Sequence, residues 1–403
     1  MSLNTNATTR LINESLDEKS ECSPPKSGTK PRLQGEAVKL AQPEPWPEPV
    51  EGAIILTNTA EAIQRHMAMR EVDTYVVALW CAHTHIFEVF GHTPRLAITA
   101  PAAECGKSVL LNLVSNLVSK PMEADNISPA PFFRLAASQQ PTFLIDEVDV
   151  WLKEDSDLRG ALNNGWQRNG QVIRCVGDSH EVRAFGTHTP VALVGIQLPK
   201  KLKETTLTRS IVVELTRALP EEVIEYYDQR KHRKVLGDLC RQLARWTTDN
   251  SATLAACDPT LPPGVLNRRA DKWRPLFAIA ESAGGVWPER VKRALLAEDS
   301  ANTYTREVQL LHDIAAILAD GTYEPGIFTD ELIDALCGTE ESNWAEYNFR
   351  QRDAEDKKIT SRQLAKLLKD YKCVSEAIRR SDGRRRGYHT NQLQAAIQRY
   401  LPH

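Results

Sequence analysis

The chain has 403 residues, enough for two or three domains with a core each. Charged residues make up 26%, hydrophobic residues 41%, and the net charge is −3, so no overall field indicates nucleic acid or acidic ligands. Eight scattered cysteines without a C-x-x-C pair argue against a zinc knuckle or disulfide scaffold and are typical of a reducing cytosol. Without a secretory signal or an uninterrupted apolar span, we expect a cytoplasmic protein with no membrane association.

Composition and periodicity divide the chain into five segments. Residues 1–50 are rich in Ser, Pro, Lys and Glu and are predicted to form a disordered tail. Residues 51–92 have helical patterns, whereas residues 93–218 alternate short apolar strands with helices, which is typical of a parallel sheet covered on both faces. Residues 219–300 are predicted to be helical throughout, as a lid, and residues 301–403 to form a C-terminal domain.

The stretch RLAITAPAAECGKSVLLNLV, residues 95–114, predicts a strand, a loop and a helix, the arrangement of a phosphate-binding loop. Lys107 is expected to reach the β- and γ-phosphates of ATP, and the Ser108 hydroxyl to hold Mg²⁺. Pro101 occupies the usual first glycine position, which weakens the motif but fixes φ at the loop entry. Predicted nucleotide contacts are Glu104, Cys105, Gly106, Lys107, Ser108 and Val109.

An acidic strand end follows about forty residues later, in PTFLIDEVD. Asp146 fits the carboxylate that holds Mg²⁺, and Glu147 fits the base that orients the attacking water. A solvated strand end is the alternative. The order of the two motifs, each on its own strand, favours an ATPase.

Three further side chains are candidates for completing the site. Gln197 ends the apolar strand PVALVGI, where a polar sensor of the γ-phosphate would lie, although a simple loop residue is as good an explanation. Arg209 precedes the strand SIVVEL, where a ring-forming ATPase presents an arginine to its neighbour; a solvent-facing arginine is the alternative. Arg268 is a candidate sensor in the lid, with Arg269 and Arg274 as rivals and a helix-face salt bridge as the simpler interpretation.

The segment GQVIRCVGDSHEVRAFGTH predicts two strands joined at residues 177–180. Ring helicases place a DNA-gripping hairpin at this point in the chain order. By that analogy His180 at the tip, with Arg174 and Arg183 on the strands, would face a central channel. An ordinary edge hairpin whose charges prevent further strand pairing is the alternative.

The C-terminal segment predicts a winged helix. TSRQLAKLLKDY is a capped amphipathic helix, and SEAIRRSDGRRRGYHT a hairpin turning at residues 381–383. From Ile359 onward there are ten Lys and Arg against three Asp and Glu. A basic wing suits DNA phosphates, whereas a solvated basic tail or a contact with an acidic protein are the alternatives. The candidate DNA contacts are Arg379, Arg380, Arg384, Arg385 and Arg386.

Together these motifs resemble a family of phosphate-binding-loop ATPases of phages, plasmids and integrative elements, catalogued as a domain of unknown function and often described as candidate helicases. Further landmarks are NISPAPFFR, LRGALNNGWQRNGQVIRCVGD and RRADKWRPLFAIAESAGG. A proline at the first loop position followed by Cys-Gly-Lys is similar to that family's own variant. Because relatives can occur beside primase modules, the resemblance implies a primase or other replication protein as a partner.

We therefore expect an α/β fold: an AAA+-like phosphate-binding-loop core with a parallel sheet, a helical lid and a C-terminal winged helix. The expected function is a DNA-associated ATPase, a candidate helicase, of a mobile genetic element, using ATP and Mg²⁺ in a homo-oligomer, as a hexameric ring. One alternative is an ATP-gated nucleic-acid-sensing switch or anti-phage defence ATPase without unwinding activity. Another is a DNA-binding module whose nucleotide site is purely structural.

Overall fold

The computed structural model describes residues 38–152, 157–301, 306–319, 323–338, 344–345, 347–348 and 357–401. Most of the predicted disordered tail, residues 1–37, lies outside this part of the chain. Within the described residues, no helix combines the length and the apolar character needed to span a membrane.

A five-stranded parallel sheet organises the first part, in the order β2-β3-β6-β1-β7. Four of its strands are those expected from the apolar runs, and the α/β prediction is confirmed. The order itself is typical of phosphate-binding-loop folds, since one strand, β6, separates the loop strand β1 from the acidic strand β3. The strands are β1 (Arg95–Ala100), β2 (Pro121–Ala124), β3 (Thr142–Ile145), β6 (Val191–Ile196) and β7 (Ser210–Glu214).

Strands β1, β3, β6 and β7 place side chains in the cores on both faces of the sheet, which explains their continuous apolar runs. In β1, Leu96 and Ile98 join one hydrophobic core and Ala97 joins the other. The first core includes side chains of α1 (Gly52–Gln64), α2 (Glu71–Thr84), α3 (Lys107–Ser115), α9 (Gln229–Asp249), α10 (Ser251–Ala256), α11 (Asn267–Ala283) and α12 (Trp287–Ala301). The second includes side chains of α4 (Pro129–Gln139), α5 (Val148–Trp151), α6 (Asp157–Asn164) and α7 (Leu198–Lys201).

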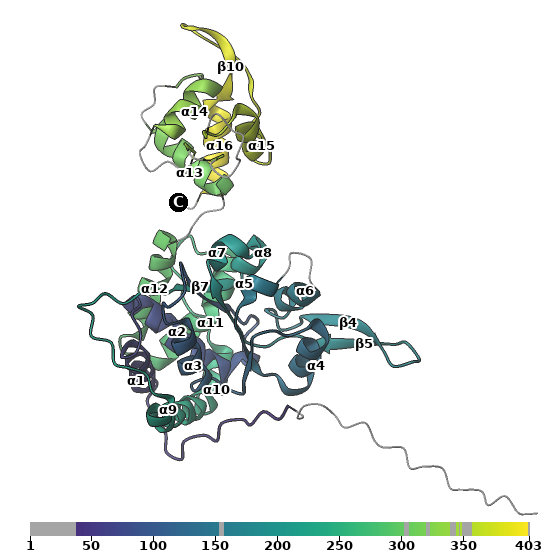
Figure 1. Ribbon diagram of the computed structural model, residues 1–403, viewed down its shortest axis with the longest axis vertical. Coiled ribbons are helices and arrows are strands. Elements are labelled where there is room, and N and C mark those ends of the chain that lie inside the picture. The colour runs from purple at the N-terminus through teal and green to yellow at the C-terminus, as the bar shows by residue number, and fades with distance from the viewer. Residues whose placement is uncertain are drawn as a thin grey trace, which may run out of the picture. The chain divides into compact units, whose positions relative to one another are not determined.

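The helices of residues 229–301 therefore share one core with α1 and α2. Figure 1 shows α11 and α12 beside α2, and α12 contacts α2 directly. Two short elements complete this part of the chain, η1 (Phe87–Val89) and α8 (Glu204–Leu207).

The prediction of helix from residue 219 is wrong at its start. Residues 215–228, here called the strap, are irregular, and α9 begins only at Gln229. The helix begins there because the Asp228 side chain accepts a hydrogen bond from the N–H of Arg230, an N-cap. Tertiary contacts hold the strap: the N–H of Glu225 donates to the carbonyl of Arg65 at 3.0 Å.

The end of the segment assigned to the tail also packs on α9. The N–H of Trp46 donates to the carbonyl of Arg241 at 3.0 Å, and the Arg241 guanidinium lies 5.3 Å from the centre of the Trp46 ring. The carbonyl of Glu44 accepts from the same guanidinium. An aromatic residue within a Pro-rich segment thus provides an anchor for residues 44–47.

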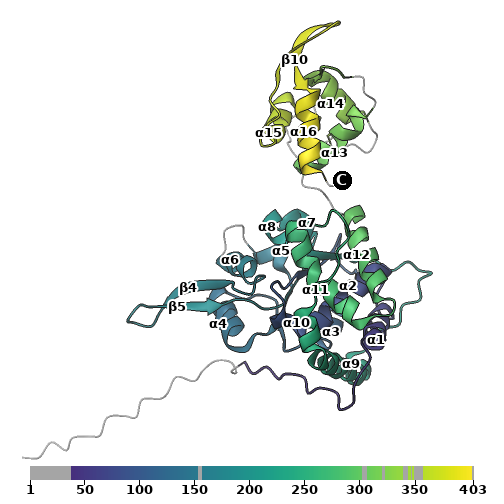
Figure 2. The same ribbon diagram turned by 180° about the vertical axis from the view of Figure 1, so that it is seen from behind.

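Both predicted hairpins are confirmed. Strands β4 (Gln171–Val176) and β5 (Glu181–Gly186) form a separate two-stranded ribbon, which extends away from the parallel sheet in Figure 1 and Figure 2. The C-terminal domain has its own core and a three-stranded antiparallel sheet in the order β8-β10-β9. Its elements are α13 (Arg306–Leu318), β8 (Gly326–Phe328), α14 (Thr329–Cys337), α15 (Ser361–Lys369), β9 (Glu376–Arg380), β10 (Gly383–His389) and α16 (Thr390–Tyr400).

Three histidines with lowered pKa values make the fold sensitive to acid: His83, His188, and His85, whose pKa is lowered to about 4 by burial. Burial, reinforced by the nearby His188 and Arg95, lowers the pKa of His83 to about 3, and burial beside Arg95 lowers the pKa of His188 to about 4. Unfolding restores a pKa near 6.5, so the unfolded chain takes up protons first as the pH falls. We expect the free energy of unfolding to fall by roughly 2 kcal/mol per histidine between pH 6.5 and pH 5.

Urea unfolding at pH 7, 6 and 5 measures this loss. Replacing His83 and His188 together with glutamine should reduce the pH dependence over this interval to the part contributed by His85, whereas His180→Gln, on the exposed hairpin, should leave it unchanged. A native protein equally stable at pH 6.5 and pH 5 would contradict the prediction.

Candidate nucleotide site and nucleic-acid surfaces

The predicted phosphate-binding loop joins β1 to α3 at the carboxyl edge of the sheet. Gly106 has φ +83°, a backbone conformation that favours glycine, and a Cβ at this position would lie 3.0 Å from Cε of Met67, a tight contact. Lys107 begins α3, is half-buried, and is followed by exposed Ser108. Because the first N–H groups of a helix have no partner within it, this end of α3 presents donors to an anion.

Three of the predicted loop contacts have distinct roles. Cys105 is buried, with its thiol 3.6 Å from the carbonyl oxygen of Ala103, so it fixes the loop. Val109 packs against the hydrophobic core and can offer a ligand only its N–H. Glu104 is exposed and has φ +63°, a strained value for a residue with a side chain.

Arg217 is a component of this site that sequence reasoning missed. It follows β7 within the strap, and its guanidinium forms a 3.1 Å ion pair with the Glu104 carboxylate, both side chains being largely exposed. A carboxylate in an anion-binding loop repels phosphate, and Arg217 offsets that charge. The available signal was its position directly after a strand ending at the same edge as the loop.

The acidic strand ends at the same edge. Asp146 follows β3 and is half-buried, while Glu147 is exposed with φ +51°. The Asp146 carboxylate accepts a hydrogen bond from the N–H of Glu147 at 2.7 Å. Since adjacent strands are about 5 Å apart, the intervening β6 leaves roughly 10 Å between loop strand and acidic strand, room for a phosphate and a water molecule.

Gln197 lies between these two strands, at the end of β6. Its N–H donates to the carbonyl of Ala100 at 3.0 Å and its side-chain amide donates to the carbonyl of Pro101 at 3.2 Å. It also has positive φ, +54°, like Glu104 and Glu147. Strained backbone conformations concentrate at functional sites, and three occur here on neighbouring loops.

Asp149 is a second missed component, and it sets the position of Gln197. Its carboxylate accepts hydrogen bonds from the N–H of Ile196 at 3.1 Å and from the Lys201 ammonium at 2.6 Å. Burial opposes ionisation, but these hydrogen bonds lower the pKa of Asp149. A Cβ at Gly195 would lie 2.4 Å from Oδ1 of Asp149, so only glycine permits this approach. The available signal in the sequence was a second aspartate three residues after Asp146, in DEVD.

Arg209 and Arg268 lie at the opposite edge of the sheet. Arg209 immediately precedes β7, and its carbonyl accepts from the N–H of Arg95, the first residue of β1. Arg268 is 3.5 Å from Oγ1 of Thr208. The five residues of β7 place this edge roughly 17 Å from the loop. Arg268 therefore does not lie where a sensor of its own chain's nucleotide would, and neither does Arg209.

The two rivals of Arg268 are engaged in ion pairs. Arg274 pairs with Asp258, and Arg269 lies 4.0 Å from Glu298. By contrast, Arg209 and Arg268 form no ion pair with a carboxylate of the described residues. Burial, and then the charge of Arg268, lowers the pKa of Arg209. Two adjacent arginines without an acidic partner are suited to receive an anion from outside the chain.

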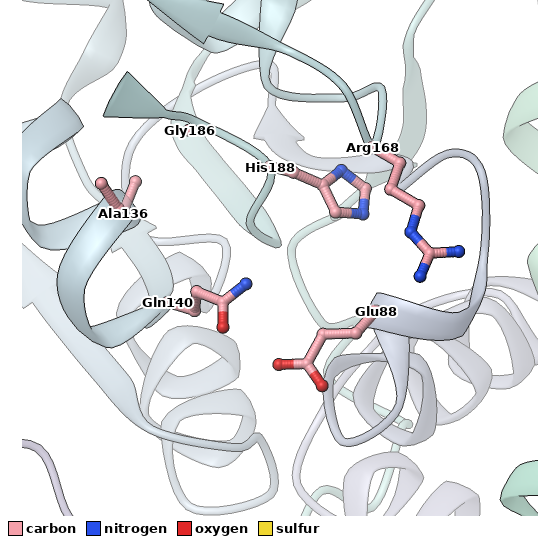
Figure 3. Close-up of a pocket in the computed structure, with 7 residues that line it drawn as sticks. Glu88, Ala136, Gln140, Arg168, Gly186 and His188 are labelled. Atoms are coloured by element: carbon pink, nitrogen blue, oxygen red, sulfur yellow. The ribbon is translucent and has the colours of Figure 1, made fainter. Parts of the chain in front are cut away.

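A pocket of about 300 Å³ lies at the same amino edge, below the hairpin. Figure 3 shows Glu88, Gln140, Arg168 and His188 around a common space. Gln140 directly precedes the β3 region and His188 precedes β6, so the pocket is at the far ends of these strands from the loop. It is separate from the candidate nucleotide site.

The β4–β5 hairpin places Arg174 directly opposite Arg183. The Arg174 guanidinium pairs with Asp157 at 3.0 Å, and Arg183 pairs with Glu181 at 2.8 Å. His180, at the tip, is exposed with φ +51°. Arg174 lies against Phe133 of α4, 5.7 Å from the ring centre, so of the three predicted residues it is the one least available to DNA.

The hairpin of β9 and β10, here called the wing, has five arginines that fall into two groups. Arg380 and Arg385 both pair with Glu331 and lie 4.2 and 4.1 Å from the centre of the Phe328 ring. Arg386 donates to the carbonyl of Ser375 at 2.6 Å. These contacts make Arg380, Arg385 and Arg386 less available to DNA. Arg379 and Arg384 are exposed, lie opposite each other, and form no ion pair within the described part of the domain.

A basic helix face complements the wing and was missed in the sequence. Arg362, Lys366 and Lys369 of α15 are exposed and spaced by four and three residues, so they share one face of the helix. The predicted capping box at the start of α15 is confirmed, with Thr360 and Gln363 as its members. The spacing of the three basic residues was the available signal.

Comparisons with known protein sequences match part of the chain. The family model described as Protein of unknown function (DUF3631) matches residues 214–400, which exclude the loop and the acidic strand. The uncharacterized 28.9 kDa protein in xis 5′ region of Saccharopolyspora erythraea is 31% identical over 193 residues, 47% of this chain and 69% of that protein. The sequence-based resemblance to a family of unknown function is confirmed at that level.

Two solved structures are similar over most of the chain. The A form apo structure of the NrS-1 C terminal region has a TM-score of 0.41 at 10% identity, covering 86% of this chain and 79% of that one. A structure of the same region bounded as 305–718 has a TM-score of 0.37 at 12% identity, covering 86% and 77%. At these TM-scores the fold assignment rests on the sheet order of this chain.

Proposed function

The chain belongs to the family described as Protein of unknown function (DUF3631), and we propose that this member is a Mg²⁺-dependent ATPase of AAA+ type that acts on DNA. One observation carries the proposal: the loop after β1, Gln197 after β6 and the carboxylates after β3 meet at one edge of a parallel sheet. In open α/β sheets, ligands bind beyond the carboxyl ends of the strands.

The residues at this edge fit Mg²⁺ and ATP by their chemistry. Lys107 and the N–H groups that begin α3 would hold phosphate oxygens, and the Ser108 hydroxyl with the Asp146 carboxylate would hold Mg²⁺, an oxygen-seeking ion. When bound, Mg²⁺ neutralises phosphate charge. Glu147 would accept a hydrogen bond from the attacking water, and Gln197, fixed to the loop, would orient it.

Arg209 and Arg268 support an oligomer. They lie at the edge opposite the loop of their own chain, without an acidic partner among the described residues, so a second copy is the natural source of the anion. We propose a closed ring, a hexamer, in which Arg209 completes the site of the next subunit, with Arg268 beside it.

The two hairpins and α15 support DNA as the partner. Like charges directly opposite each other weaken a strand pair, and the Arg379–Arg384 pair in the wing has that arrangement without a neutralising acid nearby. Phosphate would relieve the repulsion. The C-terminal domain is proposed to be a winged helix that places α15 on the duplex, while His180 and Arg183 contact a single strand. The relative's name, which locates it in the 5′ region of xis, supports a mobile genetic element.

The test is ATP hydrolysis measured alone, with single-stranded DNA and with forked DNA, alongside strand separation on forks of either polarity. DNA-stimulated hydrolysis with strand separation is the expected result. Stimulated hydrolysis without strand separation would replace the motor by an ATP-gated nucleic-acid sensor. Absence of hydrolysis under all these conditions would refute the ATPase.

The wing makes a separate prediction. Replacing Arg379 and Arg384 together with alanine should weaken DNA binding by about tenfold at 0.1 M salt and reduce the slope of log K against log salt by about 2, because two phosphate contacts are lost. Fluorescence anisotropy with a labelled duplex measures both. Arg230 and Arg233 on α9 provide the control: their double alanine variant has the same change in net charge and should bind normally.

A further inference from the structure

Three potential metal ligands converge where α1, the strap and α9 meet. They are His66, two residues beyond the end of α1, Glu225 in the strap, and His232 in the first turn of α9. One nitrogen from each imidazole and one oxygen of the carboxylate lie within 4.8 Å of one another. This cluster has no part in the proposed nucleotide chemistry.

The spacing is close to that of a tetrahedral zinc site. Zinc bonds of about 2.0–2.1 Å place neighbouring ligand atoms about 3.3 Å apart. Nε2 of His232 is already 3.4 Å from Oε1 of Glu225. Bringing all three ligands to that separation requires side-chain shifts of roughly 1.5 Å at most.

Both imidazoles are oriented as metal ligands are. Nδ1 of His66 hydrogen-bonds the carbonyl oxygen of Glu225 at 2.9 Å, and Nδ1 of His232 hydrogen-bonds the carbonyl oxygen of Asp228 at 2.9 Å. At His66 this contact favours the tautomer that leaves Nε2 with a lone pair for a metal. Nδ1 of His232 also lies 3.2 Å from the backbone nitrogen of Asp228, while its Nε2 faces Oε1 of Glu225. Tyr227 stacks on His232 and lies edge-on to His66, shielding one side.

Arg65 is compatible with this arrangement. Its Nε lies 3.8 Å from Oε2 of Glu225, while Oε1 is the oxygen that faces His232. The two carboxylate oxygens can therefore serve different partners, and Arg65 holds the carboxylate in place. A purely electrostatic cluster would need His232 protonated, whereas a metal ion binds the neutral ring.

We propose that His66, Glu225 and His232 bind one divalent transition-metal ion, Zn²⁺ being the best match to two imidazoles and a carboxylate with an open fourth position. The ion fastens the strap to α1 and α9. Met67, next to His66, packs at Gly106, and Arg217 of the strap pairs with Glu104, so the ion also steadies two supports of the loop.

The test uses the full chain, free of affinity tags, stripped with EDTA and kept in Mg²⁺. Titration with Zn²⁺ against a chromophoric chelator should give one tight site per chain, with Zn²⁺ raising the unfolding temperature and protecting the strap from proteolysis. His66→Ala, His232→Ala and Glu225→Gln should each weaken binding at least tenfold. His180→Ala, at the exposed hairpin tip, should not.

Cobalt distinguishes this site from cysteine ligation. Co²⁺ bound to imidazole and carboxylate should show visible absorption without the intense near-ultraviolet thiolate band, and Cys175→Ser should leave the spectrum unchanged. The metal-free variants must show native circular dichroism and unfolding temperature. Binding of Zn²⁺ that persists in a folded His66→Ala/His232→Ala protein, or no binding to the native chain, would overturn the proposal. Both outcomes are read from metal binding alone, so they are distinct from the failure of the proposed ATPase.

Discussion

Lys107→Ala is expected to lower ATP turnover by about 10²- to 10³-fold, the usual effect of removing a charged group that stabilises the transition state. Lys107 is the first residue of α3 and directly follows Gly106, whose left-handed backbone favours glycine, so its ammonium can reach phosphate oxygens held by the loop. Steady-state phosphate release at saturating ATP and Mg²⁺ measures the loss.

Lys234→Ala is the matched control, because this lysine is exposed on α9 and pairs with Asp238. It should leave turnover unchanged. Glu147→Gln should retain ATP binding while losing hydrolysis, since the amide cannot accept the proton of the attacking water. Normal turnover in a folded Lys107→Ala protein would exclude this loop as the catalytic site, whatever the DNA-binding result.

Local features of the sequence predicted most of the elements. Continuous apolar runs identified β1, β3, β6 and β7, and turn residues between alternating segments identified both hairpins. These predictions succeeded because burial on both faces and turn chemistry depend on neighbouring residues. Strand β2, PMEA, was missed since it is short and only half-buried, with nothing in its composition to indicate a strand.

The predictions that failed concern features that depend on contacts between residues distant in the sequence. The strap contains helix-forming residues, yet its backbone conformation is set by contacts with Arg65 and His66. His66 and Glu225, which are in contact, are 159 residues apart in the sequence. Likewise, acidic residues at the start of α14 decide which arginines of the wing remain available. The position of Arg268 in the chain predicted that it lies near the nucleotide. Its contact with Thr208, just before β7, instead places it at the opposite edge of the sheet, in the first turn of α11.

Arg209→Ala is expected to reduce ATP turnover by about 10³-fold without weakening ATP binding, because the proposed arginine acts on the phosphates of the adjacent subunit. Arg209 lies over Trp166, 5.2 Å from the ring centre, and its buried Nε has no hydrogen-bond partner among the described residues. Arg209→Lys should not restore turnover, since an ammonium cannot reproduce the planar fork.

Mixing two inactive variants distinguishes action between subunits from action within one. When Lys107→Ala and Arg209→Ala chains are combined in equal amounts, a functional site needs the intact Lys107 of one chain and the intact Arg209 of its neighbour. Random assembly of independent sites gives about one quarter of native turnover. Mass measurement must show mixed assemblies. If these form and turnover stays at the level of the single variants, Arg209 does not act across a subunit interface. The neighbouring charges of Arg209 and Arg268 would then serve a role other than ATP hydrolysis in the adjacent subunit.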